Sequence, residues 1–139
     1  MAEFIMKKLV KDEGLEKEFY IASRATHTDE IWNGTGSRIY LPAQQELKRH
    51  SVPFSYEKRA TLLNKSDYNT YDYFIGMDKE NIRYMHRILG SDRDNKIYRL
   101  LDFTEDGGNV ADPWYTGNFE NTYNDIVRGC RALLEKIIK

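Results

Sequence analysis

The sequence predicts an α/β domain in three layers, in which a mainly parallel open sheet carries helices on both faces. Three observations support this prediction. Apolar residues recur at helical spacing in three segments, and short strand-like runs alternate with the predicted helices. A chain of 139 residues is also long enough to bury a sizeable core as a single domain of residues 1–139.

The first half of the chain contains two predicted helices and one predicted strand. The first helix carries five apolar residues at helical spacing: Ala2, Ile5, Met6, Leu9 and Val10. Gly14 is placed to end this helix in a left-handed conformation. Residues 18–23 (EFYIAS) are typical of a short strand. After the turn-like residues 33–36, a second helix is expected to start near Pro42, which suits a first helical turn, and to end near His50.

The third helix follows the most strand-like segment of the chain. Residues 53–61 are expected to be extended, and residues 65–71 to form a helical turn. Residues 71–77 (YDYFIGM) have the aromatic and β-branched character of a strand. Asp78 is placed to cap the next helix, which ends at Gly90. Its apolar face consists of Ile82, Met85, Ile88 and Leu89.

One more strand and a long helix complete the predicted domain. Residues 96–103 (KIYRLLDF) predict a strand, and a polar loop follows it. The last helix has an apolar stripe that consists of Phe119, Tyr123, Ile126, Val127, Cys130, Leu133, Leu134 and Ile137. A parallel sheet also needs a strand before the first helix, yet Met1 already lies on that helix. We therefore expect the first strand and its loop to be missing from this chain.

Composition excludes several classes of function. With 21 basic and 22 acidic residues the net charge is -1, so no overall field recruits nucleic acid or a membrane surface. The single cysteine excludes an internal disulfide and a cysteine-rich zinc site. No signal peptide and no membrane span are predicted. These features indicate a cytoplasmic protein that has neither nucleic acid nor a membrane as its partner.

A ligand site is expected on the loops that follow the strands. Ligands of open α/β sheets bind beyond the carboxyl ends of the strands. Three loops qualify, at residues 23–36, 77–81 and 104–118. In the third loop, Asp112 precedes Pro113, which favours extended geometry at Asp112 and is expected to aim its carboxylate at a pocket. Asp-Pro is also a common turn opener, so a purely structural role stays open.

Four segments resemble the low molecular weight protein tyrosine phosphatases. They are MAEFIMKKL (1–9), KRAT (58–61), YDYFIGMDKENIRYM (71–85) and VADPWYTGNFENTYNDIVRGCRALL (110–134). The most specific feature is the Asp-Pro, followed by two aromatic residues and by the Phe-Glu that opens the last helix. The resemblance covers nearly the whole chain. It implies hydrolysis of a phosphotyrosine protein or a small aryl phosphate, without a cofactor or a metal.

The same resemblance implies roles for five residues. Asp112 is expected to be the general acid and then the general base. Trp114, Tyr115 and Trp32 are expected to form walls of the substrate pocket, although aromatic residues also serve as a lid over a core. Asp78 is expected to support the phosphate-binding loop, although a helix cap explains it almost as well. The loop around Trp32 departs from the family, because residues 23–26 are Ser-Arg-Ala-Thr rather than Ser-Ala-Gly-Thr.

A second departure concerns the nucleophile. Members of the family carry Cys, five residues, Arg and Ser or Thr between a central first strand and the first helix, whereas this sequence begins at Met-Ala-Glu. Cys130 lies in the last helix at core spacing, which predicts a buried structural thiol. No residue of this chain is therefore expected to act as the nucleophile, and the 139 residues alone are expected to be catalytically dead, or active only at trace level.

Three interpretations follow from this departure. The chain is a truncated phosphatase, or a genuine short form that acts by binding or self-association, or, less well supported, a relative of the arsenate reductases. A sheet without its central strand has unpaired backbone groups, which are costly when buried. Three outcomes are therefore open for the sheet. A second copy supplies the strand through a homodimer or strand exchange, or the sheet rearranges, or the chain is only marginally stable.

The remaining polar residues are given structural roles. Arg24 and Arg59 are expected on the solvated surface. His27, His50 and His86 have neither metal-ligand spacing nor an acidic partner nearby in the sequence, so no metal site is predicted.

Overall fold

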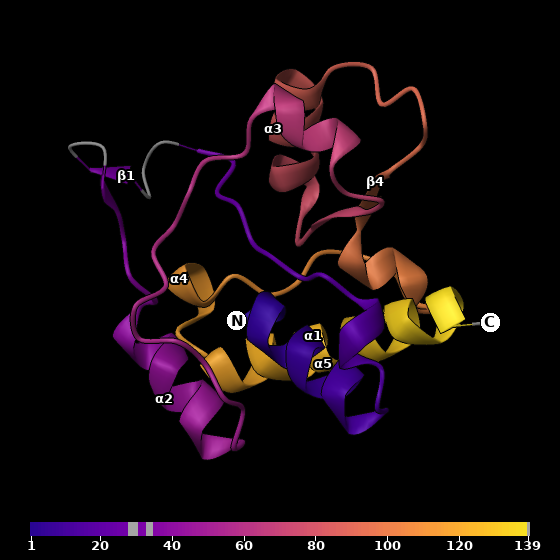
Figure 1. The fold of residues 1–139 in the computed structure, drawn as a ribbon. Helices are drawn as coiled ribbons and strands as arrows, with labels where there is room; N and C mark the ends of the chain where they lie inside the picture. Colours follow the sequence, from indigo (N-terminus) through magenta and orange to yellow (C-terminus); the bar gives the residue numbers. More distant parts are fainter. Residues whose placement is uncertain (28–30, 33–34, 139) are drawn as a thin grey trace.

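The computed structural model describes residues 1–27, 31–32 and 35–138. For residues 31, 32, 35, 114 and 115 it describes the backbone but not the side chain. The helices are α1 (Ala2–Asp12), α2 (Leu41–Arg49), α3 (Lys79–Leu89), α4 (Pro113–Thr116) and α5 (Phe119–Ile138). The strands are β1 (Ile31–Trp32), β2 (Thr35–Gly36), β3 (Phe74–Gly76) and β4 (Ile97–Arg99). The described 3-10 turns are η1 (Glu16–Glu18), η3 (Lys65–Asn69) and η4 (Leu100–Phe103). Figure 1 shows their arrangement.

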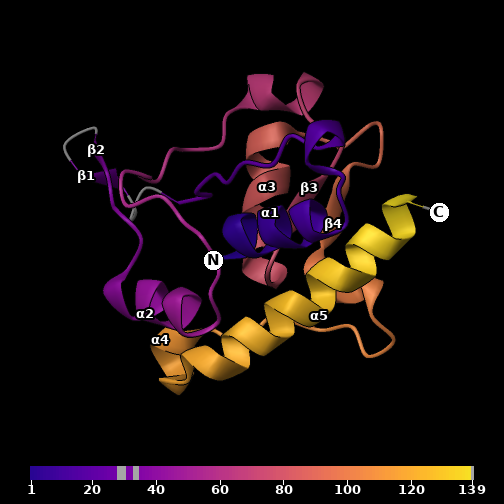
Figure 2. The same cartoon turned by 60° about the horizontal axis from the view of Figure 1, so that its bottom comes forward.

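A parallel pair of strands lies between two layers of helices. β3 and β4 pair in parallel, with Ile75 opposite Tyr98. Because side chains alternate across a strand, Phe74 packs among residues of α3, whereas Ile75 packs against the core formed by α1 and α5. Figure 2 shows α3 behind this pair and α1 and α5 in front. The predicted three-layer arrangement with a parallel pairing is confirmed, but on a smaller sheet. β1 and β2 form a separate antiparallel pair.

The prediction of a regular strand at residues 18–23 is wrong. Residues 16–18 form the turn η1, Phe19 has an extended backbone, and the described chain from there to Ala25 makes a single bridge, from Ala25 to Leu62. Ala25 N donates to Thr61 O at 2.7 Å, and Leu63 N donates to Ala25 O at 2.9 Å. A single bridge does not form a ladder, so these strand-like residues form no regular strand where the described chain offers no second partner.

The strand predicted at residues 96–103 is correct only as far as Arg99. The chain then turns into η4, in which Leu100 and Leu101 are both buried in the same core as α1 and α5. In a strand, two adjacent side chains would point to opposite faces of the sheet. The 3-10 turn instead directs both leucines into one core. Burial of the two side chains therefore outweighs the strand propensity of this segment.

The predicted helices are confirmed. Gly14 has a φ of 72° after α1, and Leu15 N donates to Val10 O at 2.9 Å, as expected for a left-handed helix end. The most buried part of the α5 stripe consists of Ile126, Cys130, Leu133 and Leu134. α1 packs along α5 in both views (Figures 1 and 2). None of the described helices combines the length and the apolar character needed to cross a membrane.

Candidate active site

The start of α3 is built at the carboxyl end of β3. Asp78 has an extended backbone and accepts a hydrogen bond from Asn81 N at 2.8 Å, which makes it the predicted N-cap. Asn81 returns the interaction, because its side-chain oxygen accepts from Met77 N at 2.9 Å. Two backbone donors at the helix start are thereby satisfied, and the chain between strand and helix has a fixed path.

The loop that carries Asp112 lies against this helix start. Val110 N donates to Met77 O at 2.9 Å. The side-chain oxygen of Asn109 accepts from Lys79 N at 3.1 Å. Two of the three loops predicted to form the site therefore meet at the carboxyl end of β3. The sequence placed both loops there but did not indicate Asn109, which joins them.

Asp112 stands at the start of a helix that the sequence analysis did not predict. Residues 113–116 form the single turn α4, where a loop was expected. Thr116 N donates to Asp112 O at 3.1 Å, and Gly117, with a φ of 70°, ends the turn. Asp-Pro is a signal for this arrangement, because aspartate suits an N-cap and proline suits the next position. Asp112 is half-buried, and Ala111 before it is hydrogen-bonded to α5.

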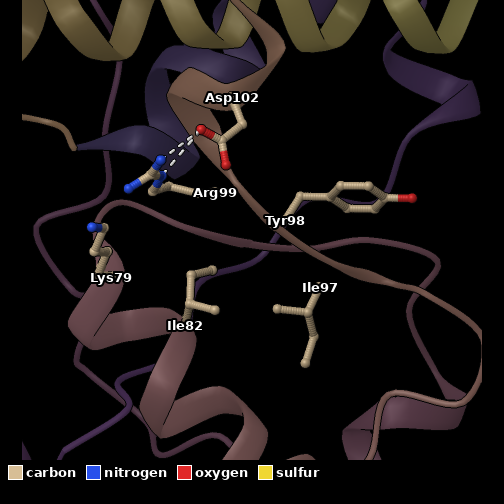
Figure 3. A pocket seen from close by; sticks show the side chains of 6 residues that line it. All are labelled: Lys79, Ile82, Ile97, Tyr98, Arg99 and Asp102. Carbon is tan, nitrogen blue, oxygen red and sulfur yellow. Dashed lines mark hydrogen bonds and ion pairs between the residues drawn. The ribbon is translucent and has the colours of Figure 1, made fainter. Parts of the chain in front are cut away.

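A pocket of about 320 Å³ lies beside the joined loops and is shown in Figure 3. It is lined by Lys79, Ile82, Ile97, Tyr98, Arg99 and Asp102. Arg99 donates to Asp102 at 2.9 and 3.1 Å, and to the side-chain oxygen of Asn109 at 3.0 Å. Arg99 therefore fixes the end of β4 to the Asp112 loop. The sequence did not predict this contact, because a single Arg at the end of a strand has no characteristic pattern.

The predicted aromatic walls lie outside the described side chains. Trp114 and Tyr115 contribute their backbone to α4, and Trp32 contributes its backbone to β1. The positions of their side chains are not described, so their roles stay predictions. Residues 28–30 and 33–34 of the first candidate loop also lie outside the described chain.

The described start of that first loop is anchored on a buried carboxylate. Glu3 accepts hydrogen bonds from Ser23 at 2.7 Å and Lys7 at 2.6 Å, and Lys58 lies 3.3 Å away. Burial opposes ionisation of Glu3, but these bonds and the charge of Lys58 outweigh it and hold the pKa of Glu3 below its usual value. Glu3 therefore stays charged and connects α1 to two distant segments.

Arg24 was predicted on the solvated surface, and this prediction is wrong. Its guanidinium donates to Tyr71 Oη at 3.0 Å, lies 3.7 Å from Asp67 and stacks over the Tyr71 ring. These contacts half-bury Arg24. Arg59 is exposed as predicted, although it also donates to Gly36 O at 3.0 Å.

The statement that the histidines lack an acidic partner is wrong for His50. Its Nε2 lies 2.7 Å from a carboxylate oxygen of Glu46, which is 2% exposed and also bonds Arg49. The His50 ring stacks on Tyr123 at 3.6 Å between ring centres. The four-residue spacing of Glu46 and His50 on one helix was the missed signal. Within residues 1–27, 31–32 and 35–138, no three His, Cys, Asp or Glu side chains come together as metal ligands would.

Cys130 has the environment of a structural thiol. Cys130 lies on the face of α5 that packs into the hydrophobic core and is 2% exposed. This burial raises the pKa of its thiol to about 12. A thiol reacts through its thiolate, so Cys130 is almost entirely unreactive near neutral pH. The prediction of a buried thiol is confirmed.

Comparison with known proteins shows the family to which this chain is similar. The sequence model described as low molecular weight phosphotyrosine protein phosphatase matches residues 1–139. The low molecular weight protein-tyrosine-phosphatase YfkJ of Bacillus subtilis is 35% identical, over 100% of this chain and 87% of the relative. The human low molecular weight phosphotyrosine protein phosphatase is 33% identical, over 98% of this chain and 85% of the relative.

Two solved structures share the fold at comparable identity. The crystal structure of YfkJ superposes with a TM-score of 0.87 at 34% identity, over 98% of this chain and 84% of that one. The phosphatase SP-PTP of Streptococcus pyogenes gives a TM-score of 0.82 at 35% identity, over 99% of this chain and 83% of that one. The chain therefore belongs to the low molecular weight phosphotyrosine protein phosphatase family.

Proposed function

We propose that this chain serves the hydrolysis of phosphotyrosine and other aryl phosphate monoesters, with Asp112 as the general acid and then the general base. The observation that carries the proposal is the junction of the Asp112 loop with the capped start of α3. Val110 N donates to Met77 O, and Lys79 N donates to the Asn109 side chain. This junction lies at the carboxyl end of β3, the edge where ligands of α/β sheets bind.

The residue type suits both steps of the reaction. A thiolate attacks phosphorus while the Asp112 carboxyl gives its proton to the departing aryl oxygen, which leaves a phosphocysteine and a phenol. The Asp112 carboxylate then takes a proton from water as the water oxygen attacks phosphorus. This second step releases inorganic phosphate and regenerates the thiolate.

Cys130 is not suited to be the nucleophile of this reaction. It is the one cysteine among the 139 residues, it is buried, and its pKa of about 12 leaves little thiolate near neutral pH. Hydrolysis therefore requires a thiolate loop from outside these residues. By themselves, the 139 residues are expected to hydrolyse aryl phosphates at trace level at most.

A comparison of two proteins tests the proposal. One is the purified 139-residue chain, and the other is a chimera that joins it to the part of the B. subtilis phosphatase that the match leaves out. We expect p-nitrophenyl phosphate hydrolysis, competitively inhibited by phosphate, from the chimera alone. Strong phosphate-inhibited hydrolysis by the chain alone would overturn the statement about the nucleophile. A folded but inactive chimera would overturn the proposed function.

Two aromatic residues that follow Asp112 in the chain, together with Trp32, are proposed as substrate walls. Trp114 and Tyr115 belong to α4, directly after Asp112, and Trp32 belongs to the separate β1–β2 pair. In the chimera, Trp114→Ala is expected to raise KM for an aryl phosphate and to leave the KM of a small alkyl phosphate nearly unchanged, because only the aryl ring needs a wall. Equal changes for both substrates would argue for a purely structural role.

A further inference from the structure

Two side chains of α5 hold the residue that precedes Asp112. Thr122 and Asp125 lie three residues apart, on one face of the helix. Thr122 Oγ1 donates to Ala111 O at 2.7 Å, and Ala111 N donates to Asp125 Oδ2 at 3.1 Å. Both backbone polar groups of Ala111 are therefore bonded to α5.

These contacts are specific to polar side chains. Thr122 is 5% exposed, at a position where valine would fill the same space without the cost of burying a hydroxyl. Its second acceptor, Asn118 O, is farther away at 3.4 Å. The Asp125 carboxylate forms a charge-assisted bond, which is stronger than one between neutral groups. It also lies 3.5 Å from Arg128, which is 3.8 Å from Asp106 at the start of the same loop.

The bonded groups belong to consecutive peptide planes around Asp112. Asp125 holds the plane between Val110 and Ala111, and Thr122 holds the plane between Ala111 and Asp112. The next plane is held from the other side, where Thr116 N donates to Asp112 O at 3.1 Å. Because planar peptide groups leave only φ and ψ free, holding the planes on both sides of Asp112 fixes the direction in which its side chain leaves the backbone.

We propose that Thr122 and Asp125 are positioning residues of α5 that set the orientation of the acid. This inference rests on the proposed role of Asp112. It gives α5 a role beyond its apolar core stripe. Loss of the Thr122 hydroxyl frees the peptide plane that contains Asp112 N–H, whereas loss of the Asp125 carboxylate frees Ala111 N–H.

NMR of the 139-residue chain tests each bond separately. Asp125→Ala is expected to speed hydrogen exchange of Ala111 N–H about tenfold, and Asp125→Asn, which keeps an acceptor oxygen, much less. Thr122→Val is expected to reduce the residual dipolar coupling of Asp112 N–H, and Thr122→Ser to restore it. The dipolar couplings of Ile126 and Leu133 in α5 are expected to stay unchanged in all four variants.

Two outcomes would overturn the inference. One is a wild-type Asp112 coupling in Thr122→Val together with wild-type Ala111 exchange in Asp125→Ala. The other is a change of the α5 couplings in parallel with that of Asp112, which would show a general structural role. Neither measurement needs turnover. An inactive chimera would therefore overturn the role of Asp112 as the acid but not the bonds that hold its backbone, whereas wild-type values in these variants would overturn the positioning and leave the role of Asp112 untouched.

Discussion

Replacing Gly129 with alanine tests the packing that holds α5 in place. An added Cβ at Gly129 would lie 2.5, 2.9 and 3.1 Å from three side-chain carbons of Leu100, well below the 3.4 Å of an ordinary contact. Leu100 is 1% exposed, so the side chain that would have to move lies in a closely packed core. The substitution therefore forces α5 and η4 apart, and α5 carries the side chains that bond Ala111.

Two opposing effects decide the magnitude. Glycine in a helix interior is less favourable than alanine by about 1 kcal/mol, so propensity alone predicts stabilisation. Overpacking of a filled core costs about 1–3 kcal/mol. Because all three close contacts involve one fully buried side chain, we expect the steric cost to exceed the gain in helix propensity. Gly129→Ala should lower the free energy of unfolding by about 1 kcal/mol.

Urea unfolding of the 139-residue chain measures this difference. Asn124→Ala, on the exposed face of the same helix, serves as the matched control and should raise the free energy of unfolding by about 0.5 kcal/mol. Leu100→Ala removes the clashing atoms, so adding Gly129→Ala to it should be neutral or stabilising. A Gly129→Ala chain that is more stable than wild type, with Leu100 intact, would refute the reasoning.

Three further predictions concern single polar or reactive groups. Asp78→Ala should lower the free energy of unfolding by about 1 kcal/mol in urea, and Asp78→Ser by much less, because serine also caps helices; equal losses would contradict the cap. Burial of Asp92 is outweighed by bonds from Lys96 N, Tyr68 and Ile97 N, which hold its pKa below the usual value. The contribution of the Asp92 carboxylate to the free energy of unfolding is complete above the unfolded-state pKa of about 4 and is lost as the pH falls through the lower folded-state pKa. The difference in the free energy of unfolding between wild type and Asp92→Asn should therefore shrink in acid. A difference that does not change with pH would contradict the lowered pKa. Cys130 should react with a thiol reagent only after denaturation, and equally fast labelling of the native chain would disprove its burial.

Local signals predicted the helices well. The apolar periodicity of α5 and the cap at Asp78 depend on residues within one or two turns, and both are present in the structure. The strands were predicted less well, because their length depends on distant partners. The aromatic run at residues 71–77 forms only the short β3, and the pair Leu100 and Leu101 leaves β4 for a 3-10 turn.

The candidate site was predicted to the level of its loops. The rule for α/β sheets places the Asp112 loop near Asp78, and the backbone bond from Val110 N to Met77 O agrees with it. Asn109, Thr122 and Asp125 could not be found in this way. Their partners are backbone groups 11 to 30 residues away, and a single polar side chain carries no sequence signature for such a contact.

The most direct test of the role of Asp112 is the hydrolysis of two substrates by the B. subtilis chimera carrying Asp112→Asn. Phenyl phosphate has a leaving group that needs protonation, whereas p-nitrophenyl phosphate needs it much less. We predict that kcat/KM for phenyl phosphate falls by about 10²- to 10⁴-fold, that kcat/KM for p-nitrophenyl phosphate falls less, and that inhibition by phosphate is unchanged. An unchanged kcat/KM for phenyl phosphate would contradict the assignment of Asp112 as the acid.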